Sequence, residues 1–104
     1  MKIAIGCDNA GYPLKEVVAG LLKEEHPDLD VVDFGVSSAD DPEYYPDVAE
    51  RVALAVAGGD FDRGILICGT GLGMAMTACK VPGIRAATCH DTYSAERAIA
   101  SNNA

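Results

Sequence analysis

Short apolar runs alternate with helix-like patterns along this chain, and that alternation constrains its fold more than any other sequence feature. Residues 2–7, 30–34, 64–68 and 84–89 are rich in apolar or β-branched residues and are typical of strands. Each run is followed by a segment with apolar residues at helical spacing or with helix-start signals. The order βαβαβαβα predicts an α/β fold, a Rossmann-like three-layer α/β/α sandwich with a parallel sheet and right-handed crossovers.

Four helices are expected between and after these strands. In the first, apolar residues at i, i+3, i+4, i+7 and i+8 predict one apolar face, with Pro13 in the first turn. The second helix is predicted to follow a polar loop at 37–46 and to end near Gly58-Gly59. The third spans Leu72–Lys80, and the fourth begins at His90-Asp91 and ends near Ala100. The predicted apolar faces consist of Leu14, Val17, Val18, Leu21 and Leu22 in the first helix, and Val48, Val52, Ala55 and Val56 in the second.

A glycine-rich turn follows the nearly all-apolar strand at 64–68. Gly69, Gly71 and Gly73 alternate with other residues as GxGxG, which is not the GxGxxG spacing of dinucleotide-binding turns. Glycine permits a tight turn, and the amide groups at the start of the next helix can hold an anion. Ligands in parallel α/β folds bind beyond the carboxyl ends of the strands. The residues expected there are Cys7-Asp8-Asn9, Gly35, Cys68–Gly73 and Cys89-His90-Asp91.

Cys68 distinguishes this turn from an ordinary connection between a strand and a helix. A helix N-terminus stabilises a thiolate, and a thiolate at this position could act as a base near neutral pH. The same amide groups could stabilise an oxyanion that forms when a proton is removed beside a carbonyl. Thr70 adds a hydroxyl at the mouth of the turn. The turn therefore contains the groups that an enolisation requires, although a plain structural turn is the simpler alternative.

Charge and cysteine usage narrow the class of protein. The net charge of −8 disfavours nucleic acid as a partner, and a phosphorylated substrate would need local compensation. The four cysteines at 7, 68, 79 and 89 form no CxxC pair, so neither a zinc site nor a disulfide framework is expected. Outside the turn, they are expected to be small buried residues. No membrane span or signal peptide is expected, which favours the cytoplasm.

Several strings in the chain closely resemble the ribose-5-phosphate isomerase B family. They are GILICGTGLG at 64–73, KVPGIRA at 80–86, IGCDNAG at 5–11, Tyr45-Pro46 and Tyr93-Ser94-Ala95. That family also contains galactose-6-phosphate isomerase subunits and erythrulose-4-phosphate isomerase. The resemblance covers essentially the whole chain, so residues 1–104 are expected to form a single sugar-phosphate isomerase domain.

The resemblance implies a cofactor-free, metal-independent aldose–ketose isomerase that works through a cis-enediolate, usually as a homodimer or dimer of dimers with shared active sites. By position, it implies that Cys68 is the base and that Thr70 assists at the substrate oxygens. It also implies an anion hole in the backbone of the turn. The implied substrate contacts are Asp8, Asn9, Tyr45, Gly69, Gly71, Leu72, Gly73 and, from the neighbouring subunit, Asn102.

The chain departs from the family pattern in three places. Asn9 and Ser101 occupy positions where the family usually has histidine, and the second of those histidines is the one implied to open the sugar ring. The family also continues beyond residue 104 with a fifth strand, a helix and phosphate-binding arginines, so the chain is expected to be truncated.

A tetrose 4-phosphate cannot form a furanose ring, so the missing histidine favours an erythrulose 4-phosphate isomerase as an alternative. Another possibility is that His90 replaces the missing histidine as the ring-opening acid. The simpler alternative is that His90 only begins the last helix and has no catalytic role.

Two other functions remain open at this point. A nucleotide-binding module would use Asp91, after the next predicted strand, as a ribose contact. A non-catalytic relative would only pair with a partner chain. Intact Cys68 and Thr70 favour the enzyme over this last possibility.

Overall fold

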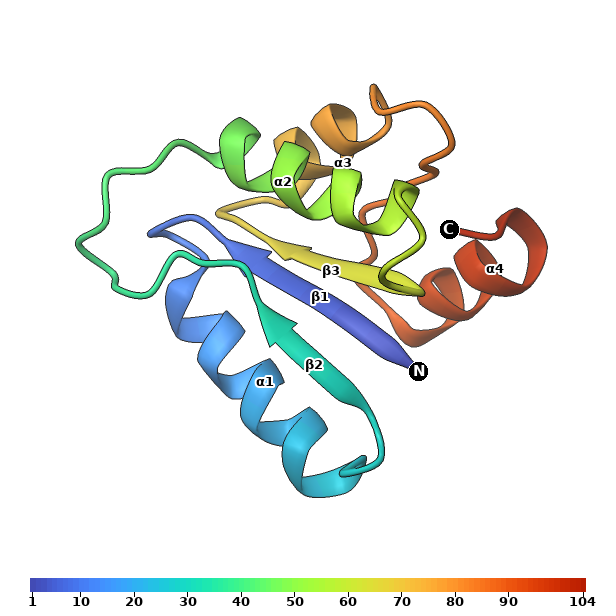
Figure 1. The fold of residues 1–104 in the computed structure, drawn as a ribbon, viewed down its shortest axis with the longest axis horizontal. Coiled ribbons are helices and arrows are strands. Elements are labelled where there is room, and N and C mark those ends of the chain that lie inside the picture. Colours follow the sequence, from blue (N-terminus) through green and yellow to red (C-terminus); the bar gives the residue numbers. More distant parts are fainter.

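The computed structural model describes all 104 residues and contains three strands and four helices (Figure 1). The elements in chain order are β1 (Lys2–Cys7), α1 (Tyr12–Glu25), β2 (Asp30–Asp33), α2 (Tyr45–Ala57), β3 (Arg63–Ile67), α3 (Leu72–Ala78) and α4 (Thr92–Asn102). The three strands are parallel and lie in the order β2-β1-β3.

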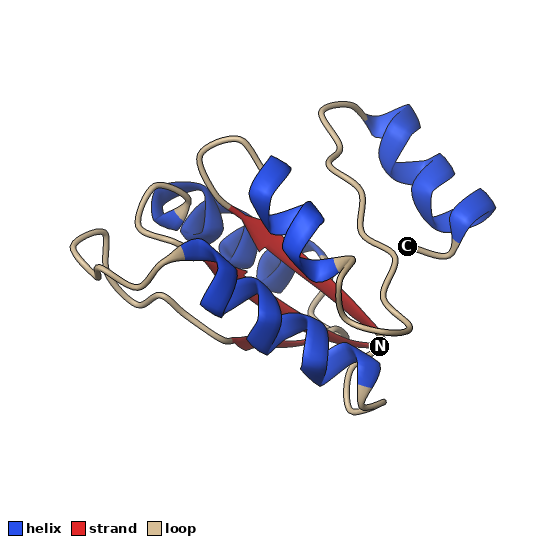
Figure 2. Cartoon of the chain, turned by 90° about the horizontal axis from the view of Figure 1, so that it is seen from above, coloured by secondary structure: helices blue, strands red, loops and turns tan.

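Helices cover both faces of this sheet, which confirms the predicted α/β/α layers. α1 packs on one face, while α2 and α3 lie together on the other (Figures 1 and 2). β1 is buried because it is the central strand, and its residues 3–7 are all shielded from solvent. Gly6, near the end of β1, and Gly64 on β3 allow α2 to approach closely: a Cβ on Gly6 would lie 2.8 Å from a methyl of Val48. The main hydrophobic cluster joins the ends of β1 and β3 to α2 and α3.

The predicted fourth strand at 84–89 is wrong. This segment pairs with no strand, so β3 is an edge of the sheet (Figure 1). Polar groups of this segment form hydrogen bonds outside the sheet. The Ala86 backbone exchanges two hydrogen bonds with the Cys79 sulfur, and the Arg85 guanidinium donates to the Asn103 carbonyl. A strand exists only where a ladder forms, so a strand-like composition without a pairing partner does not make one.

The predicted apolar face of α1 is also partly wrong. Val18 and Leu22 are half-buried against the sheet, as expected, but Leu14, Val17 and Leu21 are 55%, 65% and 49% exposed. The residue in their place is Lys15, which is fully buried. Since α1 has apolar residues over a wide arc, its sequence did not decide which side faces the sheet.

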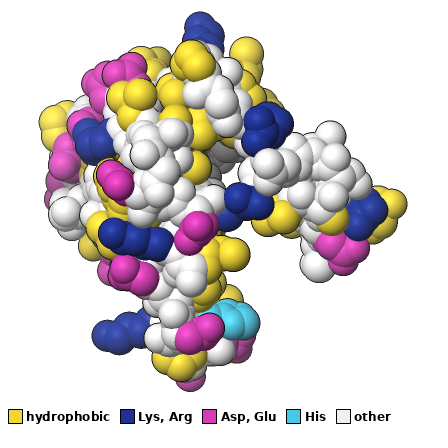
Figure 3. Space-filling model, turned by 45° about the vertical axis from the view of Figure 1, so that its right-hand side comes forward, with side chains coloured by type: hydrophobic (Ala, Val, Ile, Leu, Met, Phe, Trp, Pro, Cys, Tyr) yellow, Lys and Arg dark blue, Asp and Glu magenta, His cyan; other side chains and the backbone are white.

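The last helix, α4, packs against no other helix or strand and has no buried residue (Figures 1 and 2). It begins at Thr92, two residues later than predicted, because the Asp91 carboxylate accepts a hydrogen bond from the Ser94 amide at 2.7 Å and so caps the helix. Its far end is tied to the body by Asn103, whose amide oxygen accepts from Arg63 at 3.0 Å. α4 forms the lobe that projects at the right of Figure 3. Over the face of the molecule seen in that figure, acidic and basic side chains are interspersed.

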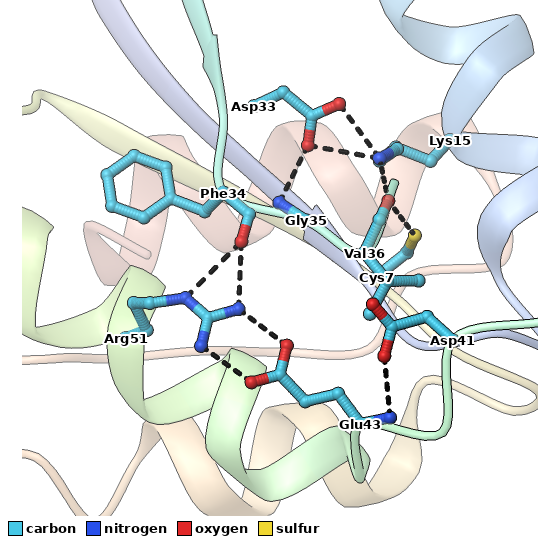
Figure 4. A network of polar contacts seen from close by, with 9 residues as sticks. All are labelled: Cys7, Lys15, Asp33, Phe34, Gly35, Val36, Asp41, Glu43 and Arg51. Atoms are coloured by element: carbon cyan, nitrogen blue, oxygen red, sulfur yellow. Dashed lines mark hydrogen bonds and ion pairs between the residues drawn. The ribbon is translucent and has the colours of Figure 1, made fainter. Parts of the chain in front are cut away.

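A charged clamp closes the loop that leads into α2. The Arg51 guanidinium donates to both carboxylate oxygens of Glu43 at 2.8 Å and to the Phe34 carbonyl at 2.8 Å (Figure 4). Bidentate pairing of this kind is the strongest form of an arginine–carboxylate contact. The clamp therefore joins the end of β2 to the start of α2.

The clamp predicts a specific dependence of stability on pH. Hydrogen bonding to Arg51 lowers the pKa of Glu43 below its ordinary value of 4.5. A depressed pKa means that the stabilisation is complete above the unfolded value and is lost as the pH falls through the folded one. Between about pH 5 and pH 3, the free energy of unfolding should fall more steeply for the wild type than for Glu43→Gln. Urea titrations at several pH values would measure both slopes, and equal slopes would contradict the prediction.

Candidate active site

The carboxyl ends of β1 and β3 bring the two predicted loops together. Cys7 is paired with Ile67, so Asp8 and Cys68 leave adjacent strands at the same level of the sheet. The Asp8 amide donates to the Ile67 carbonyl at 3.3 Å, which extends the pairing to the point where the loops begin. A Cβ on Gly69 would lie 3.9 Å from that of Ala10, so the loop after β1 borders the glycine turn. Asn9, which precedes Ala10, is exposed beside it.

The turn folds back on the Cys68 sulfur. The Gly71 amide donates to the Cys68 Sγ at 3.0 Å, which fixes the sulfur at the mouth of the turn. Gly71 has a φ of 80°, a left-handed conformation that only glycine adopts easily, which explains this glycine. The Thr88 hydroxyl donates to the Gly71 carbonyl at 3.1 Å and holds the turn from outside.

Three other amides of the turn are free. Those of Gly69, Thr70 and Gly73 donate no hydrogen bond within the chain, whereas the Leu72 amide donates to the Thr70 hydroxyl at 3.2 Å. These free amides and the exposed Thr70 hydroxyl lie within five residues of the half-buried Cys68 thiol. Unpaired backbone donors of this kind suit an oxyanion or a phosphate.

Tyr45, the first residue of α2, lies against this turn. A Cβ on Gly73 would come within 2.5 Å of Tyr45 Cζ, so Gly73 must be a glycine for the ring to lie there. The ring is half-buried, packs on the main hydrophobic cluster and has an edge-to-face contact with Tyr44 at 4.8 Å. The predicted pocket residue and the predicted turn thus meet, although they are far apart in sequence.

Asp8 is held in place at one carboxylate oxygen. Its Oδ1 accepts from the Gly11 amide at 2.9 Å, and no hydrogen bond within the chain engages Oδ2. Gly11 is itself buried against Ile67: a Cβ there would lie 2.7 Å from the Ile67 carbonyl carbon. Asp8 therefore presents a fixed carboxylate with one oxygen available beside the Cys68 turn.

The structure does not bring every predicted residue to this turn. His90 is exposed in the segment before α4, and Asn102 is exposed at the end of α4, the helix that packs against no other element. The Asp91 carboxylate is occupied by the cap of α4, and hydrogen bonding to Ser94 lowers the pKa of Asp91. This occupation leaves Asp91 poorly suited to the ribose contact that a nucleotide-binding module would need.

Several residues with a role near the turn were missed in the sequence. Thr88 was assigned to a strand, Gly11 was noted only as the end of the IGCDNAG string, and Lys15 belonged to no motif. The one signal available in the sequence was a charged residue, Lys15, within a helix predicted to have an apolar face. The prediction that all three other cysteines are buried holds only for Cys7, since Cys79 and Cys89 are exposed.

Burial raises the pKa of the Cys7 thiol, partly opposed by the charge of Lys15, so Cys7 is disfavoured as a thiolate.

No cluster of three or more histidine, cysteine or acidic side chains that could hold a metal ion occurs in the structure. None of its helices combines the length and apolar character needed to cross a membrane.

Comparison with known proteins gives a consistent result. The sequence profile described as "Ribose/Galactose Isomerase" matches residues 3–104. The chain is 58% identical over 104 residues to "Ribose-5-P isomerase B" of Listeria innocua, of which it covers 68%. It is 51% identical to "D-erythrulose-4-phosphate isomerase 2" of Mycolicibacterium smegmatis, and again covers 68%. All of this chain superposes on 68% of the Clostridium thermocellum ribose-5-phosphate isomerase B structure, with a TM-score of 0.93 and 48% identity.

Proposed function

Since this chain belongs to the ribose/galactose isomerase family and is a sugar-phosphate isomerase of the ribose-5-phosphate isomerase B type, we propose that it interconverts ribose 5-phosphate and ribulose 5-phosphate. In this proposal Cys68 is the base and the intermediate is a cis-enediolate. The single observation that carries it is the 3.0 Å contact from the Gly71 amide to the Cys68 sulfur, with free amides around it.

Each group of the turn has a step in the proposed reaction. The Cys68 thiolate removes the proton from C2 of the open-chain aldose, and the electron pair moves through the new C1–C2 double bond onto O1. The free amides of Gly69 and Gly73, with the Thr70 hydroxyl, stabilise this oxyanion and assist proton transfer between O2 and O1. Cys68 then returns the proton to C1, which gives the ketose and restores the thiolate.

The surrounding residues hold the sugar in this proposal. The free Oδ2 of Asp8 accepts from a sugar hydroxyl, and the Tyr45 ring closes the pocket above Gly73. Asn9 and Leu72 line its rim. We also propose that Asn102 acts in a neighbouring subunit of a homodimer, because it lies on α4, which packs against no other helix or strand of its own chain. His90 follows Thr88, which contacts Gly71, and is the second candidate for the missing acid.

A tetrose phosphate is the second candidate substrate. The position where the family usually carries the ring-opening histidine is Ser101, and a tetrose 4-phosphate forms no furanose ring to be opened. The 51% identity to an erythrulose-4-phosphate isomerase favours the same candidate.

A substrate panel tests the two candidates. We expect turnover of ribose 5-phosphate with kcat/KM above that of erythrulose 4-phosphate, incorporation of deuterium from D2O at the transferred position, and no turnover of unphosphorylated ribose. The reverse order of kcat/KM would favour the tetrose. Absence of turnover and of deuterium exchange with every sugar phosphate would refute the proposed function.

A further inference from the structure

Lys15 is the one charged side chain that the fold buries completely. Its ammonium group lies 2.8 Å from Asp33 Oδ2 and donates to the Val36 carbonyl, directly behind the carboxyl end of β1 (Figure 4). Burying an ammonium group costs several kcal/mol, and even a well-paired ion often stabilises a fold no better than an apolar residue would. A lysine here is therefore better explained by the geometry that it imposes than by stability.

That geometry concerns residues 34–44, the β2–α2 loop. Its first part continues along β1, because the Cys7 amide donates to the Gly35 carbonyl at 2.7 Å and the Val36 amide to the Cys7 carbonyl at 2.8 Å. Lys15 fixes this start: it joins Val36 to Asp33, whose Oδ1 also accepts from the Gly35 amide at 2.8 Å.

The other end of the β2–α2 loop leads directly to the proposed pocket. The Arg51–Glu43 clamp holds that end against the Phe34 carbonyl (Figure 4). Tyr45, the first residue of α2, directly follows the loop. Two charged anchors thus hold the loop that precedes the Tyr45 ring, Lys15 at its start and Arg51 at its end. Cys68 lies on a different connection and has no hydrogen bond or ion pair with either anchor.

We propose that Lys15 is a positioning residue, which holds the β2–α2 loop against the end of β1 so that Tyr45 lies over the Cys68 turn. The inference rests on the proposed function, in which Tyr45 contacts the substrate. It assigns to Lys15 an effect on substrate binding and not on proton transfer.

The test compares Lys15→Met with Lys23→Met, an exposed lysine of the same helix. Lys15→Met should raise KM about tenfold with little change in kcat, because uniform binding is lost while the base is untouched. In a Tyr45→Ala background the same substitution should raise KM no further, since Lys15 acts through Tyr45. Lys23→Met should match the wild type. An unchanged KM, or the same rise in both backgrounds, would overturn the inference.

A second readout needs no turnover. Nuclear Overhauser contacts between the Tyr45 ring and the Gly73 α-protons should be present in the wild type and Lys23→Met, and lost in Lys15→Met. Their persistence in Lys15→Met would overturn the inference even in a chain without activity, which separates its failure from failure of the proposed function. If Lys15→Met does not fold, Arg51→Met removes the other anchor; it should lose the same contacts, and their retention there would overturn the inference.

Discussion

Replacing Cys68 with alanine is expected to lower kcat/KM by about 10²–10⁴-fold, the usual contribution of a general base. Cys68 is only half-buried at the margin of the hydrophobic cluster, and alanine keeps its Cβ there, so the core loses little apolar contact. Stability should therefore change little while proton transfer fails. Steady-state kinetics, deuterium exchange and a thermal melt on the same sample would measure both effects.

Cys89→Ala is the matched control for this substitution. Cys89 is an exposed cysteine outside the turn, and its replacement should leave kcat/KM and the melting temperature unchanged. Comparable activity in Cys68→Ala and Cys89→Ala would end the proposal that Cys68 is the base. A loss of activity accompanied by unfolding would show a structural role for Cys68 instead.

Gly11→Ala is expected to have the largest effect on stability, a loss of about 3 kcal/mol in the free energy of unfolding. The added Cβ would lie 2.7 Å from the carbonyl carbon of Ile67 and 2.9 Å from its Cγ2. The nearest neighbour is backbone at the end of β3, so no side-chain rotation relieves the clash. α1 would have to move away from the sheet, which would also displace the amide that holds Asp8.

Gly20→Ala in the same helix provides a control with the opposite sign. A Cβ on Gly20 meets nothing within 4 Å, so the substitution should stabilise the protein by about 0.5–1 kcal/mol through helix propensity alone. Urea titrations of both variants would measure the difference. A Gly11→Ala variant as stable as the wild type would contradict the packing of α1 against Ile67.

Much of the site followed from local sequence because it depends on element type and order. Residues 64–68 and the glycines after them indicated a strand, a tight turn and a helix start, and the structure has all three. The strand is an edge strand in which only Ile67 is buried, so the expected burial on both faces was wrong. Since parallel strands end at one edge of the sheet, the sequence alone predicted that Asp8 and Cys68 lie close together. The observed pairing of Cys7 with Ile67 has that consequence.

Other features were beyond local sequence because they depend on which surfaces meet. The segment at 84–89 had the composition of a strand, yet a strand needs a partner, and its polar groups are bonded elsewhere. The helical period of α1 was correct, but its apolar arc was too broad to show that Lys15 faces inward. The requirement for Gly73 comes from the Tyr45 ring, which no spacing in the sequence reveals.

The sequence by itself therefore determined the layered α/β order, the Cys68 turn and its position at the carboxyl edge of the sheet, because periodicity and glycine chemistry act over a few residues. The tertiary structure alone decided the packing of the Tyr45 ring against Gly73, the burial of Lys15 behind β1 and the separation of α4 from the body. These features arise from contacts between segments distant in sequence, whose energies depend on packing and pairing in three dimensions.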